Sequence, residues 1–106
     1  MIFTAGVIGW DEEERFAASD LVGQFRQVLF NTLAILREDG AGPEHVVRMT
    51  WYVTDRGDYV AHAREIGAAS RELMGKHFPT MAVVEVAGLV ESEAKIEIET
   101  IAVVPE

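Results

Sequence analysis

The chain has 106 residues and a formal net charge of -9, with 9 lysines and arginines against 18 aspartates and glutamates. This length predicts a single domain over residues 1–106, and the acidic balance argues against nucleic-acid partners because phosphate backbones repel it. Cysteine is absent, which excludes a disulfide scaffold, a thiolate zinc site and a cysteine nucleophile and suits a cytoplasmic location. No segment reads as a signal peptide or as a membrane span, so no membrane partner is expected.

A strand is expected over residues 2–8, where Ala5 and Gly6 permit close backbone approach. It begins without a polar leader, so either the chain is shortened relative to a complete domain or this strand is its terminus. An acidic loop follows, with a short second strand expected near Arg15 and Phe16.

A helix is expected from Leu21, with Ser19 as the N-cap and Asp20 in the first turn, to a stop at residues 40–43. Its apolar residues recur at helical spacing and predict one buried stripe. The solvent-facing side is expected to comprise Gln24, Arg26, Gln27, Arg37 and Glu38.

Residues 45–54 alternate in character and predict a strand. Val47, Met49, Trp51 and Val53 are expected on one face, and Val46, Arg48, Thr50 and Tyr52 on the other. The second face is neither clearly polar nor clearly apolar, which is typical of a face that meets another subunit. Trp51 and Tyr52 could line a pocket, although a core position is the commoner use of such residues.

A second helix is expected over residues 59–74, followed by strands over 80–86 and 94–103. The helices are separated by single strands, and the chain ends on two consecutive strands. This order predicts an α+β fold with a mixed sheet and two helices packed on one face.

Signatures of the common hydrolases, nucleotide-binding proteins and zinc proteases are absent from the sequence. The three histidines, at positions 45, 62 and 77, are too widely spaced to indicate a metal site and are expected on the surface or in loops.

Glu97 and Glu99 are the strongest candidates for chemistry on residue pattern alone, since they share one strand face opposite Ile96 and Ile98. Buried between subunits, such a carboxylate could transfer protons. Glu85 is expected on a neighbouring strand, on the face of Met81 and Val83. The alternative interpretation is a solvated strand face, or pairing with Arg48 of another subunit.

The chain resembles the RidA/YjgF family, also called endoribonuclease L-PSP, over nearly its whole length. The resemblance is carried by FTAG, QFRQVLFNTLAILREDGAGPEHVVRMTWYVTD, FPTMAVVEVAGL and KIEIETIAVV. It implies a fold like that of Bacillus-type chorismate mutase and a homotrimer whose sheets form a central barrel, with clefts between neighbouring subunits. It also implies hydrolytic deamination of imines or enamines, with no metal and no organic cofactor.

The family's deaminases carry an arginine two residues after the proline of this segment, where it grips the substrate carboxylate. Here that position is Met81, which cannot hold a carboxylate. Glu97 matches the glutamate that orients or activates the attacking water. Ala5 stands where the family usually has serine, and Gly67 aligns approximately with the family's asparagine. The resemblance therefore implies a divergent member.

Two functions remain open. In the first, Glu97 positions water for hydrolysis of a 2-aminoacrylate- or 2-aminomuconate-like imine or enamine. Backbone amides near Val83 and Val84 polarise this substrate. The candidates to replace the missing anchor are Arg48, Arg15 and Arg26. In the second, the chain is a non-catalytic trimer that binds a small molecule at the subunit interface. Its apolar cleft would be lined by Met81, Val83, Trp51 and Phe3.

Overall fold

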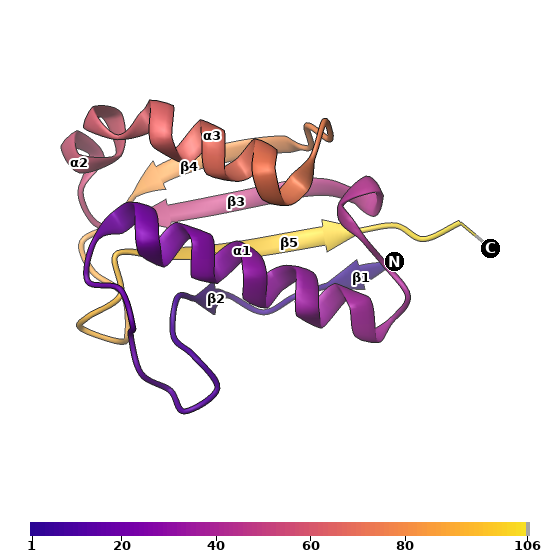
Figure 1. Cartoon of the computed structure of the whole chain (residues 1–106), viewed down its shortest axis with the longest axis horizontal. Coiled ribbons are helices and arrows are strands. Elements are labelled where there is room, and N and C mark those ends of the chain that lie inside the picture. The colour runs from indigo at the N-terminus through magenta and orange to yellow at the C-terminus, as the bar shows by residue number, and fades with distance from the viewer. Residues whose placement is uncertain (106) are drawn as a thin grey trace.

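The computed structural model describes residues 1–105, in which a mixed sheet carries helices on one face (Figure 1). The elements are β1 (Ile2–Phe3), β2 (Val7–Ile8), α1 (Leu21–Glu38), the 3₁₀ turn η1 (Pro43–His45), β3 (Val46–Val53), α2 (Arg56–Ala61), α3 (Ala63–Met74), β4 (Thr80–Glu85) and β5 (Ile96–Ala102). The strand order is β1-β5-β3-β4, with β2 also paired to β5. Only the β3–β4 pair is parallel among these described strands.

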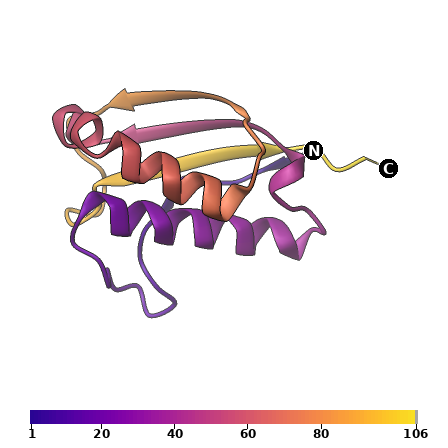
Figure 2. The same ribbon diagram turned by 45° about the horizontal axis from the view of Figure 1, so that its top comes forward.

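The three helices lie on the same side of the sheet, and the other face of the sheet is left open (Figure 2). This arrangement confirms the expected α+β fold with a mixed sheet. The core lies between the helices and the covered face of β3 and β5, where Phe25, Leu29, Met49, Ile96 and Ile98 are buried.

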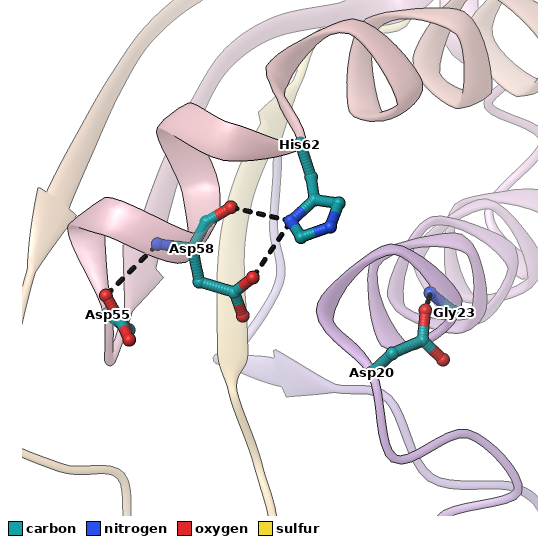
Figure 3. Close-up of polar contacts among 5 residues, drawn as sticks. All are labelled: Asp20, Gly23, Asp55, Asp58 and His62. Atoms are coloured by element: carbon teal, nitrogen blue, oxygen red, sulfur yellow. Dashed lines mark hydrogen bonds and ion pairs between the residues drawn. The ribbon is translucent and has the colours of Figure 1, made fainter.

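Helix α1 follows the predicted apolar stripe but begins with a different cap. Asp20, not Ser19, is the N-cap, and its carboxylate accepts a hydrogen bond from the Gly23 amide at 3.0 Å (Figure 3). A capping side chain must precede the first helical residue, and that residue is Leu21. The helix ends before Gly40, whose φ of +72° suits glycine.

Gln24 is buried, so the prediction that it faces solvent is wrong. Its Nε2 donates to the Ala18 and Glu93 carbonyls at 3.2 and 2.9 Å, and its Oε1 accepts from the Lys95 amide at 2.8 Å. One amide side chain therefore joins α1 to the loop before it and to the loop before β5. Helical periodicity treats every glutamine as polar and cannot reveal partners that lie about 70 residues away.

Strand β3 contains an irregularity near its start. Its register against β5 shifts between Val46 and Arg48. An extra residue of this kind turns the chain, so Val46 is buried and Val47 is 45% exposed, the reverse of the predicted alternation. Beyond the shift the prediction holds, and Met49, Trp51 and Val53 face the core.

The single helix expected over residues 59–74 is two helices, α2 and α3, which meet at His62. The ring Nδ1 of His62 lies 2.9 Å from both the carbonyl and a carboxylate oxygen of Asp58 (Figure 3). These contacts, led by the carbonyl, raise the pKa of His62. At the other end of α2, the Asp55 carboxylate accepts from the Asp58 amide at 3.1 Å, and Glu85 accepts from the Arg56 amide at 2.8 Å.

The N-terminal strand expected over residues 2–8 is interrupted, and its two short pieces both pair with β5. The second strand expected near Arg15 and Phe16 is wrong. Arg15 instead closes a turn in which its amide donates to the Asp11 carboxylate at 3.1 Å. The last two strands occur where expected, within two residues at each end.

Candidate functional site

A cavity of about 1070 Å³ opens beside β1 and β2, between this edge of the sheet and α1. Apolar walls come from Phe3, Val7, Ile8, Trp10, Phe30 and Ile35. Polar groups come from Gln27, Asn31 and Glu97, and further carboxylates come from Asp11, Glu12, Glu13 and Glu91. An apolar hollow with a few convergent polar groups is the usual form of a small-molecule site.

Strand β5 carries Glu97 into this cavity. Ile96 and Ile98 are buried on the covered face, so the two-residue period of the strand turns Glu97 to the opposite face, as predicted. Its neighbours across the sheet are Ile8 on β2 and Tyr52 on β3. A Cβ atom added at Gly6 would lie 2.5 Å from Glu97 Oε2, so the backbone of Gly6 lies against the carboxylate.

Asn31 fixes the wall of the cavity, and reasoning from residue types did not single it out. Its Nδ2 donates to the Ile8 and Trp10 carbonyls at 3.1 and 2.9 Å, while its Oδ1 accepts from Gln27 Nε2 at 2.8 Å. The available signal was the spacing of Gln27 and Asn31, which places the two amides one turn apart on α1.

Glu99 lies two residues beyond Glu97 on the open face of the sheet. Its carboxylate interacts with the Tyr52 hydroxyl, and this hydrogen bond, followed by burial and the nearby negative charges of Glu99 and Glu97, raises the pKa of Tyr52. Glu99 does not line the cavity, so the two carboxylates have different surroundings.

Met81, Val83 and Val84 lie on β4, at the opposite edge of the sheet from the cavity. The parallel register pairs Met81 with Met49 and Val83 with Trp51, on the face that the helices cover. Val84 instead lies beside Tyr52 on the open face. Within one chain, therefore, none of these three residues reaches Glu97.

Phe3, Trp51 and Arg48 have three different environments. Phe3 is 67% exposed and lines the cavity with Glu97. Trp51 is buried in the core, where its ring packs against Phe25 with centroids 4.8 Å apart, and this matches the commoner role considered above. Arg48 lies on the open face, four residues along β3 from Tyr52, a separation of about 13 Å.

Arg15, Arg26 and Glu85 each have another polar partner within the chain. Arg15 forms an ion pair with Glu13, and Arg26 forms one with Glu72 at 2.7 Å on the helical side. Glu85 shares the covered face with Val83, as predicted, but β3 separates its strand from β5. Glu85 and Glu97 therefore do not form a pair.

Within residues 1–105, no group of three or more histidine and carboxylate side chains is placed to hold a metal ion. The same part of the chain contains no helix with the length and apolar character needed to cross a membrane.

The family described as Endoribonuclease L-PSP matches residues 1–104. A RutC family protein of Pasteurella multocida is 35% identical over 97% of this chain and 79% of that protein. TdcF of Escherichia coli, named as a proposed reactive intermediate deaminase, is 31% identical over 97% of this chain and 78% of its own length.

Two solved structures have the same architecture. The crystal structure of TdcF with bound serine has a TM-score of 0.82 at 30% identity, covering 97% of this chain and 80% of that one. The YjgF gene product of Escherichia coli has a TM-score of 0.80 at 32% identity, covering 95% and 78%. These likenesses confirm the chorismate-mutase-like fold.

Proposed function

The chain belongs to the endoribonuclease L-PSP family, also called RidA/YjgF, and on this premise we propose that it is a hydrolytic deaminase of a small imine or enamine. The observation that carries the proposal is the Glu97 carboxylate, held against Gly6 in a cavity with apolar walls. The name of TdcF, a relative that is similar over nearly the whole chain, supports the same reaction class.

In this reaction Glu97 acts as the general base. Water adds to the carbon of the C=N bond while Glu97 accepts a proton from it, and the electrons of the π bond move to nitrogen. Glu97 then returns this proton to nitrogen and next carries the proton of the new hydroxyl group to the same nitrogen. The C–N bond breaks as the C=O bond forms, so ammonia leaves a carbonyl product. The half-buried position of Glu97 suits this role, since both water and substrate reach it from the cavity.

We place the complete site between subunits of a homotrimer. Met81 and Val84 lie at one edge of the sheet, and the Glu97 cavity lies at the other edge. The Met81 edge of a neighbouring copy can therefore pack against the Glu97 cavity of this chain. Apolar side chains are exposed at both edges, with Phe3 at 67%, Met81 at 40% and Val84 at 41%. Repeating one such contact around a threefold axis closes a ring. Sedimentation at micromolar concentration tests the assembly, and a clean monomer contradicts it.

A second candidate function is binding without turnover. It is favoured by the cavity lining, which includes no lysine, arginine or histidine among the described residues. A 2-imino or 2-amino-enoic acid would find no counter-charge for its carboxylate within one chain.

The deciding experiment compares ammonia release from freshly generated imines and enamines, including 2-aminoacrylate and 2-aminomuconate, by the wild type, Glu97→Gln and Glu99→Gln. Glu99 is the matched control because it shares the strand and face of Glu97 but does not line the cavity. The deaminase is supported if the wild type turns a substrate over, Glu97→Gln is slower by about a hundredfold or more, and Glu99→Gln keeps the wild-type rate. Turnover no faster than in buffer on every substrate, whether or not it carries a carboxylate group, supports the binding protein.

A further inference from the structure

We propose that the cavity beside Glu97 selects a cationic ligand, an iminium or ammonium ion with an apolar arm and no carboxylate group. This inference rests on the proposed function, because it concerns the same cavity. It adds a statement about the charge of the ligand. It applies to a substrate and to a ligand bound without turnover alike.

The first argument is electrostatic. Five carboxylate side chains line the cavity, and no basic side chain does so within the described part of the chain. Of these five carboxylates, Arg15 forms an ion pair only with Glu13 and offsets the charge of that one. Glu12 and Glu91 form no side-chain hydrogen bond or ion pair with the described residues, and both are exposed. Charges of one sign around a hollow with apolar walls concentrate ligands of the opposite sign and repel those of the same sign.

The second argument is the aromatic lining. Phe3, Trp10 and Phe30 all face the hollow. Trp10 is held in place, because its ring packs against Phe16 with centroids 6.1 Å apart and its carbonyl accepts from Asn31. Aromatic faces attract cations and also cover the apolar arm of a ligand.

The third argument is the position of the nearest candidate anchors for an anion. Arg26 is paired with Glu72 on the helical side, and Arg48 lies about 13 Å along β3 from the residue beside Glu97. Within one chain, neither reaches a carboxylate attached to the carbon next to the reacting C=N bond. Among the charged side chains that one chain brings to the cavity, an iminium ion without a carboxylate meets only opposite charge. Its hydrolysis balances as iminium plus water giving a carbonyl compound and ammonium.

The test uses two stable probes with the same apolar arm, 2-phenylethylammonium and 3-phenylpropionate. Binding of each to the full chain is measured by NMR chemical-shift changes at residues 3–13 and 27–35. We expect the cation to bind at least about tenfold more tightly at low salt, with the preference falling as salt screens the charges. Equal binding of the two probes, tighter binding of the anion, or binding of neither overturns the inference.

A pair of double variants isolates the charge. Glu12→Gln with Glu91→Gln should weaken binding of the cation about threefold to tenfold, because each exposed charge contributes modestly. Glu65→Gln with Glu72→Gln makes the same change in net charge on α3, which does not line the cavity, and should leave binding unchanged. An equal effect of the two double variants contradicts selection by the cavity.

A second measurement separates this inference from the deaminase proposal. Amine oxidase converts 2-phenylethylamine to an imine without a carboxylate, and amino acid oxidase converts phenylalanine to the matching imine with one. Consumption of each imine is followed in competition with semicarbazide. If the cation binds but neither imine is consumed faster than in buffer, the deaminase proposal fails and the inference stands. If the amino-acid imine alone is hydrolysed and the anionic probe binds, the inference fails and the deaminase proposal stands.

Discussion

Gly6 and Glu97 are in such close contact that a single methyl group between them would displace the carboxylate: the Cβ of an alanine at position 6 would lie 2.5 Å from Glu97 Oε2. Because the obstructing atom ends a flexible side chain, Gly6→Ala should move Glu97 rather than unfold the protein. We expect imine consumption to fall about tenfold to a hundredfold, since a small misplacement of a reacting group costs this much. Normal turnover in Gly6→Ala with Glu97 displaced would argue against Glu97 as the base.

Gly67 offers a contrasting glycine on α3. A Cβ there meets no atom within 4 Å, and the residue is exposed in the interior of the helix. Gly67→Ala should therefore raise the free energy of unfolding by about 0.5–1 kcal/mol through helix propensity alone. Urea denaturation measures it, and destabilisation would mean that the open space is filled in solution.

Gln24 should be costly to replace. Gln24→Leu removes three hydrogen bonds and leaves the Ala18 carbonyl, the Glu93 carbonyl and the Lys95 amide without their partner. We expect a loss of about 3 kcal/mol in the free energy of unfolding. Arg37→Ala, an exposed change on the same helix, serves as the control and should alter stability by less than about 0.5 kcal/mol.

The start of α1 distinguishes two adjacent capping candidates. Asp20→Ala should cost about 1 kcal/mol of stability because it removes the acceptor for the Gly23 amide. Ser19→Ala should change stability little, since Ser19 precedes the cap. Equal effects in thermal denaturation would show that both side chains cap the helix.

His62 should make stability depend on pH. Its pKa is raised above 6.5 in the folded chain, so protonation favours the fold. This contribution is complete below pH 6.5, the ordinary value, and is lost as pH rises through the folded pKa. The stability of the wild type relative to His62→Gln should therefore be constant below pH 6.5 and decline as pH rises above it. A constant or rising difference in chemical denaturation would contradict the assignment.

The sequence-based predictions succeeded where spacing along one element decides the outcome. The strand period placed Glu97 opposite Ile96 and Ile98, and the helical stripe placed Phe25 and Leu29 in the core. They failed where a partner is remote in sequence. The irregularity at Val47 depends on the pairing of β3 with β5, and the burial of Gln24 depends on loops near residues 18 and 94.

The candidate site was predictable only in part for the same reason. Phe3 and Glu97 meet because β1 and β2 both pair with β5, an arrangement that residue patterns do not encode. Met81 and Val83 were expected with Phe3 in a cleft between subunits, and strand order places β4 at the far edge of the sheet, so one chain does not bring them together. Local pattern gives the face of each strand, while the neighbours of that strand come from the tertiary fold.

The acidic residues that line the cavity lie partly on a strand and partly on loops. Glu97 is on a strand between buried neighbours, whereas residues 11–13 and Glu91 are on exposed loops. Loops accept substitution at little cost in stability, and a strand flanked by core residues does not. Mutation can therefore alter the ligands that enter while the carboxylate stays in place, so descendants of one ancestor can exchange ligands without having to evolve the buried strand again.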